Sequence, residues 1–131
     1  MLPYISNIEK LFNECDEIQA LLEIPVSDDM NELIEHGNKL IIELARTGKM
    51  LSDAKYLQDQ AINKSIIQIL KDNKNISPSI AKQLIDSSTE KENYLVSWCD
   101  RLNRSCTHQL DWIRSVVSKN KEEMKLNQFM K

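Results

Sequence analysis

The sequence predicts an all-α protein, in which a long antiparallel helical hairpin and a shorter N-terminal helix assemble into an oligomeric helical bundle. The chain has 131 residues with only 2 Gly and 3 Pro, and 5% of its residues are aromatic. A β-sandwich or barrel needs many turn residues and alternating apolar residues, so both are disfavoured. Apolar residues recur instead at steps of three and four, as on one face of a helix. The length predicts a single domain over residues 1–131.

The first predicted helix spans about residues 6–23. Its apolar residues form one stripe from Ile5 to Leu22, and most of its charged residues fall on the other face. Pro25 ends this helix, because the residue before a proline avoids the helical region. The candidates for the N-cap of the next helix follow directly: Ser27, Asp28 and Asp29.

The second predicted helix spans about residues 29–71, a stretch without proline. At 1.5 Å per residue it would be a rod of roughly 65 Å. Gly37 and Gly48 lie eleven residues apart and so on nearly the same helix face. We expect them to allow another helix to approach closely, with a local bend as the alternative.

The third predicted helix spans about residues 78–125 and follows a turn over 72–76. Ser77 at the cap and Pro78 at the first helical position mark its start. A break near Ser87–Thr89 stays open, since Thr89 and Glu92 have the spacing of a capping box. A short turn makes the two long helices antiparallel. With the turn centred near residue 75, the numbers of two residues that face each other should add up to about 151.

The net charge of −3 conceals a gradient along the chain. Residues 1–60 carry 12 acidic and 5 basic side chains, whereas residues 101–131 carry 3 acidic and 7 basic ones. A basic end is typical of a polyanion partner. The alternative, which the antiparallel register favours, is that the basic end lies along the acidic half and neutralises it.

No catalytic, cofactor-binding or metal-binding residue is predicted, and no enzyme motif is present. Cys99 and Cys106 would lie about 10.5 Å apart along one helix, too far for a single zinc ion even with His108 nearby. We expect both thiols to pack as small core residues. The register also brings His108 near Glu43, so a buried pair there is an alternative to a solvated face. Phosphate loops and hydrolase motifs are absent from the sequence.

A basic strip over residues 101–121 is the basis of a nucleic-acid interpretation. Its cations are interleaved with aromatic residues that could stack on bases. Trp98 is expected in the core and Trp112 at an interface. The candidate contact residues are Arg101, Arg104, His108, Trp112, Arg114, Lys119 and Lys121.

Self-association is the leading functional prediction. The first helix is less than half as long as the other two, so it covers only part of the groove between them. The uncovered apolar strip would exceed what monomers usually expose. A dimer or tetramer is therefore predicted, with these interface candidates: Leu57, Ile62, Ile66, Ile69 and Leu84.

Two segments, 47–56 and 101–111, resemble small uncharacterised helical proteins carried in prophages and related bacterial mobile elements. This resemblance implies an accessory protein encoded near recombination or replication functions, and it implies no catalytic residue. The sequence has no apolar run long enough to cross a membrane and no export signal. A cytoplasmic location with three reduced cysteines is therefore expected.

Overall fold

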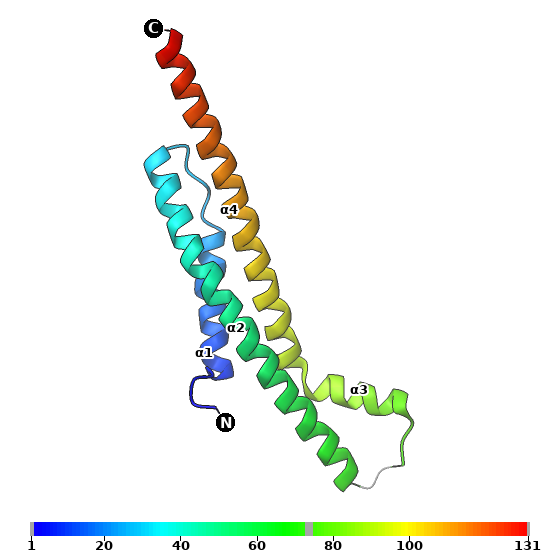
Figure 1. The fold of residues 1–131 in the computed structure, drawn as a ribbon. Helices are drawn as coiled ribbons and strands as arrows, with labels where there is room; N and C mark the ends of the chain where they lie inside the picture. The colour runs from blue at the N-terminus through cyan, green and yellow to red at the C-terminus, as the bar shows by residue number, and fades with distance from the viewer. Residues whose placement is uncertain (1, 73–74, 131) are drawn as a thin grey trace.

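A computed structural model describes residues 2–72 and 75–130, and the chain is all-helical over these two ranges. The helices are α1 (Ile8–Leu22), α2 (Met30–Lys71), α3 (Pro78–Ser88) and α4 (Glu90–Met130), as Figure 1 shows. The all-α prediction is therefore confirmed. The turn predicted over 72–76 includes residues 73 and 74, which lie outside the described residues.

The helices begin where the sequence offers capping side chains. The Asn7 side chain accepts from the Lys10 N–H, so α1 starts two residues later than predicted. The Asp29 carboxylate accepts from the Asn31 N–H at 2.8 Å and caps α2. Ser77 caps α3, with Pro78 at the first helical position. These polar side chains satisfy N–H groups that lack a partner at a helix start.

Helices α2 and α4 pack antiparallel in the predicted register. The Gln58 side chain donates to the Asn93 side chain at 2.8 Å, and these two numbers complete the expected sum of 151. Asn103 donates to the Thr47 hydroxyl at 3.0 Å, one residue from the expected pairing. The hairpin prediction is therefore correct over the length that α2 and α4 share.

The third predicted helix is broken, which is the alternative that the sequence leaves open near Ser87–Thr89. It is divided at Thr89, which caps the end of α3 with φ −118° and ψ 21°. The hydroxyls of Ser88 and Thr89 both donate to the Ile85 carbonyl, at 3.0 and 2.8 Å. Such bonds from Ser and Thr to the preceding turn bend or end helices. As a result α3 diverges from the axis of α4, and α4 then runs to Met130 rather than to about 125 (Figure 1).

The hydrophobic core lies between α1, α2 and α4. Beside it stand partly buried side chains, including Phe12 and Trp98, whose ring centroids lie 6.3 Å apart. The buried apolar residues are Leu11, Cys15 and Ile18 of α1, Leu33, Leu40, Met50 and Ala54 of α2, and Leu95, Cys99, Leu102, Cys106, Leu110 and Ile113 of α4.

The buried residues are confined to one part of the molecule. We call this part the bundle half: α1, residues 30–54 of α2, Thr89, and residues 90–113 of α4. The tip consists of residues 55–72 and 75–88, which include α3, and none of them is buried. In Figure 1 the tip is the angled end of the molecule, where α2 and α3 diverge.

The two glycines face α4, as predicted. A Cβ atom on Gly37 would lie 3.4 Å from the Ile113 side chain, whereas one on Gly48 would lie 3.9 Å from the Asn103 amide nitrogen. Gly37 therefore allows the closer approach of the two helices. Among the described helices, none combines the length and the apolar character that a bilayer crossing requires.

Candidate interaction surfaces

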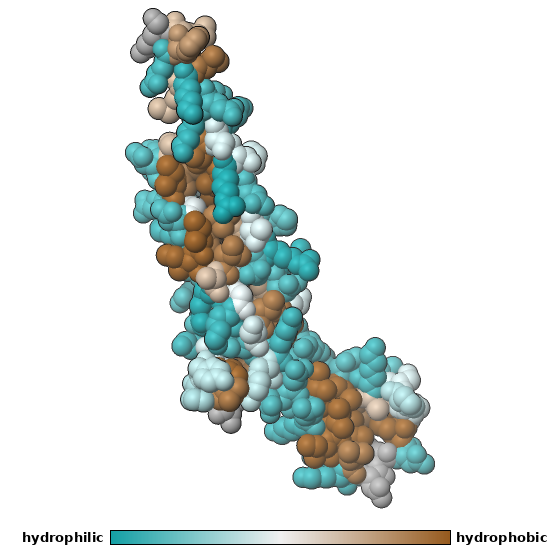
Figure 2. All heavy atoms as spheres, viewed as in Figure 1, coloured by the Kyte–Doolittle hydropathy of each residue, from teal (hydrophilic) through white to brown (hydrophobic). Residues whose placement is uncertain are grey.

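The tip carries a cluster of exposed large hydrophobic side chains. Leu70 is 72% exposed, and Ile66 is 40% exposed. Figure 2 shows apolar surface gathered over this end of the molecule. We call the cluster the tip patch, and it consists of Ile66, Ile67, Leu70, Ile80 and Leu84.

Two of the five predicted interface residues belong to the tip patch, whereas Leu57 packs against the core of the bundle half. Ile66 and Leu84 are exposed, while Leu57, Ile62 and Ile69 are half-buried. A groove of about 210 Å³ runs between α2 and α3 and is lined in part by Ile69 and Leu84. Leu70 and Ile80 belong to the uncovered apolar strip that the sequence predicts toward the turn, whereas sequence reasoning missed Ile67, which is 52% exposed.

The basic strip on α4 divides between two helix faces. At 100° per residue, five of its seven residues share the side opposite the core. All of them are exposed, and Trp112 is 60% exposed. We call this side the outer basic face, and it consists of Arg101, Arg104, His108, Trp112 and Lys119.

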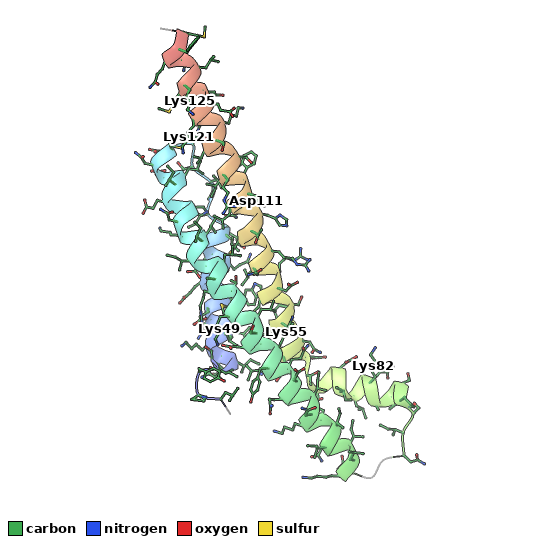
Figure 3. The ribbon with its side chains drawn as sticks, viewed as in Figure 1. Lys49, Lys55, Lys82, Asp111, Lys121 and Lys125 are labelled. Atoms are coloured by element: carbon green, nitrogen blue, oxygen red, sulfur yellow. The ribbon has the colours of Figure 1, made fainter. Side chains whose placement is uncertain are left out.

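Arg114 and Lys121 lie on a different flank of α4. Arg114 lines a groove between α2 and α4, and it lies 4.0 Å from the Asp111 carboxylate. Figure 3 labels Lys121 at the level where α2 begins and Lys125 on the part of α4 that projects beyond it. The predicted strip is therefore not one continuous surface.

Helix α4 lies along α2, as the predicted neutralisation of the acidic half requires, and the neutralisation itself stays a prediction. Within residues 2–72 and 75–130, no ion pair joins α2 to α4. Arg104 pairs with Asp100 of its own helix at 3.2 Å. The acidic residue Glu14 of α1 is paired instead with Arg46 of α2. The outer basic face points away from the acidic helix, because α4 turns its apolar side to the core.

The alternative of a buried pair between Glu43 and His108 is wrong. His108 is exposed on the outer basic face, and Glu43 lies beside a groove between α1 and α2. His36 is the histidine that bridges helices, since its Nε2 lies 3.2 Å from the Gln109 side-chain oxygen. Gln109 also donates to the Leu22 carbonyl at the end of α1, at 2.7 Å. One amide thus links three helices.

A second polar link lies at the centre of the α2–α4 contact. The Asn103 amide donates to the Leu44 carbonyl at 3.2 Å and to the Thr47 hydroxyl at 3.0 Å. Thr47 is completely buried, so this link satisfies polar atoms that water does not reach. Asn103 belongs to the polar segment 101–111, whose density predicts such a contact between helices or subunits.

An apolar groove that sequence reasoning missed lies between α2 and α4 near Gly37. Its volume is about 360 Å³, and Ile34, Ile41 and Val117 contribute to its lining. Ile34 and Ile41 are both exposed. The helical spacing of residues 34 and 41, one position away from the core residues 33 and 40, is the signal that could have found it.

The three cysteines are completely buried, as predicted for Cys99 and Cys106, whereas His108 is exposed. Cys15 of α1 and Cys99 of α4 meet with their Sγ atoms 3.7 Å apart. Burial raises the pKa of the Cys106 thiol to about 11. The part of the chain that is described holds no group of three or more His, Cys, Asp or Glu side chains suited to a metal ion.

No protein-family model, curated protein or solved structure matches this chain. The resemblance of residues 47–56 and 101–111 to prophage proteins therefore stays a prediction.

Proposed function

We propose that this chain is a non-enzymatic structural or interaction protein that assembles with copies of itself into a dimer or tetramer through the tip patch. The observation that supports the proposal is the tip itself, which exposes five large hydrophobic side chains and buries no residue. Monomers rarely leave such a surface uncovered, because contiguous apolar patches favour association. As the resemblance suggests, its setting would be a prophage or mobile element in the bacterial cytoplasm.

A second copy of the chain is the occupant that fits this surface best. Covering the remaining exposed area of the tip patch is worth on the order of 5 kcal/mol per chain, at 1.5–3 kcal/mol for each fully buried side chain. A two-fold arrangement brings the same patch from both chains, so the gain is doubled while the cost of association is paid once. The groove between α2 and α3 offers a recess for an apolar side chain of the partner.

Sedimentation at micromolar concentration tests this proposal. The wild-type chain should have two or four times the 15.2 kDa mass of a single chain. Ile66→Glu with Leu84→Glu should lower the mass to that of one chain with little loss of helicity, because both side chains are exposed. Higher salt should not dissociate the wild type, since the interface is apolar.

The matched control is Ile41→Glu with Ile42→Glu, which places two charges on isoleucines of the bundle half that are at least as exposed as the test pair, at 52% and 66%. This variant should associate like the wild type. A wild-type mass near 15.2 kDa with intact helices would contradict self-association. Dissociation by the control pair alone would indicate an interface at the α2–α4 groove and would contradict the tip patch as the site of self-association.

A second candidate function is nucleic-acid binding by the outer basic face, as an accessory protein of recombination or replication. The observation that favours it is the shared exposure of Arg101, Arg104 and His108 on one face with Trp112. Such a face can contact phosphates with its cations and stack a base on its indole ring.

Gel-shift experiments with single- and double-stranded DNA at two salt concentrations test this candidate. Binding should weaken steeply at the higher salt, because phosphate contacts release counterions. Arg101→Glu with Arg104→Glu should abolish it, whereas Lys55→Glu with Lys82→Glu, an equal charge change on α2 and α3 (Figure 3), should leave most of it. Equal loss with both pairs, or no binding by the wild type, would contradict the candidate.

A further inference from the structure

Two thiols from different helices meet in the centre of the bundle half. Cys15 of α1 and Cys99 of α4 are separated by 84 residues in the sequence, yet their Sγ atoms lie 3.7 Å apart. Both side chains are completely buried, between core residues of all three helices. Cys106, also on α4, is equally buried and forms no hydrogen bond with another thiol within the described residues.

We propose that Cys15 and Cys99 form an oxidisable dithiol site, which reacts with a low-molecular-weight disulfide and becomes an intramolecular disulfide that joins α1 to α4. The sulfurs are already in contact, and a disulfide bond requires them to approach to about 2.05 Å. Rotation of the two side chains with a small shift of α1 supplies this movement. The inference does not depend on self-association, because the site lies in the bundle half.

The reaction is two successive thiol–disulfide exchanges. Cys99 first loses its proton to water, and its thiolate then attacks one sulfur of the small disulfide. The S–S bond of the small disulfide breaks, and the first small thiol leaves as a thiolate that takes up a proton from water. The Cys15 sulfur then attacks the Cys99 sulfur of this mixed disulfide, and the second small thiol leaves with the Cys15 proton. Two electrons thereby pass from the protein thiols to the small disulfide, which is reduced to two thiols.

The environment of the pair favours Cys99 as the first attacking group. A hydrogen bond from the Cys15 thiol lowers the pKa of Cys99 below its ordinary value of 9.0. The same bond and burial raise the pKa of Cys15. Cys106 lacks such a donor, and its raised pKa makes it the slower thiol to react.

Access to the pair requires α1 to move away from the hairpin, because neither thiol is exposed. Helix α1 has 15 residues and is the shortest element of the bundle half. Its polar attachments are few and partly buried: the ion pair between Glu14 and Arg46, the bond from the Trp98 indole to Gln19 at 3.1 Å, and the bond from Gln109 to the Leu22 carbonyl at 2.7 Å. A short helix near one end of the chain can open locally while the rest of the fold stays intact. Oxidation would convert a helix that can open into one that is covalently held.

Refolding the full chain from denaturant in mixtures of reduced and oxidised glutathione tests the proposal, since unfolding removes the limit that burial sets on access. As the oxidised fraction rises, the protein should lose the mass of two hydrogen atoms. Peptide mapping should then show a link between Cys15 and Cys99. Thermal unfolding of the oxidised protein should shift upward by roughly 10 °C, because a long loop is closed in the unfolded chain.

Single substitutions separate this pair from the third thiol. Cys15→Ala and Cys99→Ala should each abolish the loss of two hydrogens, whereas Cys106→Ala should retain it. In the wild type, a link that includes Cys106, or three free thiols at every glutathione ratio, would overturn the proposal even if a variant failed to fold. Hydrogen exchange provides a further measurement, and oxidation should slow exchange in α1 but not in α3. Unchanged exchange in α1 would overturn the inference that the bond holds this helix in place.

Discussion

The bundle half and the tip are built from similar sequence, yet only the bundle half has a core. Both contain leucine and isoleucine at helical spacing, and α2 runs without interruption through both. In the bundle half these residues include the completely buried Leu40 and Leu102, whereas in the tip Leu70 stays largely exposed. The difference shows that helical apolar spacing alone does not bury a residue. Burial also requires a third helix that covers the two antiparallel helices.

The extent of α1 accounts for where the core ends. The chain before α1 is attached to α2 at Asp53, whose carboxylate accepts from the Ser6 N–H at 3.3 Å. Met50 and Ala54 are the last buried apolar residues of α2. Beyond this level α2 has only α3 and the start of α4 beside it. Two packed helices each cover one side of the other, and the remaining apolar surface stays in water.

Truncating a leucine in each half gives the largest expected difference. Leu102→Ala should lower the free energy of unfolding by about 2–5 kcal/mol, because it leaves a cavity in a closed core. Leu84→Ala in the tip should lower it by less than about 1 kcal/mol in the single chain, since that side chain is exposed. Urea denaturation of the Ile66→Glu background, measured at low concentration, checks both values. Equal losses would show that the tip is as well packed as the bundle half.

The buried thiols make the bundle half sensitive to alkaline pH. The pKa of Cys106 is raised to about 11 in the folded chain, above its ordinary value of 9.0. The stability that the neutral Cys106 thiol contributes is therefore complete below pH 9, and it is lost as the pH rises toward 11. Between these values the wild type should lose on the order of 3 kcal/mol more than Cys106→Ala, at about 1.4 kcal/mol for each unit of pKa.

Urea denaturation of both proteins at pH 7, 9 and 11 measures this difference. Glu92→Gln, which changes a charge at the start of α4 without removing a thiol, serves as the control and should follow the wild type. Parallel losses in the wild type and Cys106→Ala would contradict the assignment of the alkaline loss to this thiol.

The two glycines of α2 give the smallest expected effect. Gly48→Ala should stabilise the chain by about 1 kcal/mol, because alanine is the better helix former and the new methyl group lies at ordinary contact distance. Gly37→Ala should stabilise the chain by less, since its methyl group would lie 3.4 Å from the Ile113 side chain. Thermal unfolding of the two variants provides the comparison, and a larger gain for Gly37→Ala would show that this contact is looser than the structure indicates.

Features that depend on neighbouring residues could be predicted from the sequence. Asp29 caps α2, and Ser77 with Pro78 starts α3, because each signal acts on N–H groups within three residues of itself. The antiparallel register followed from the shortness of one turn. The break at Thr89 was left open, because the outcome depends on hydroxyl bonds to the Ile85 carbonyl that compete with a continuous helix.

The starts of α1, α2 and α3 and the register of the long pair could be predicted from the sequence, because periodicity and caps are local. Only the tertiary structure decided which surfaces stay open. The placement of α1 closed one side of the hairpin, brought Cys15 to Cys99 and left the tip uncovered. The packing of α2 against α4 leaves His108 exposed and places His36 beside Gln109. These outcomes depend on contacts between residues far apart in the chain, where the rotation of each helix selects the partner and no local pattern records it.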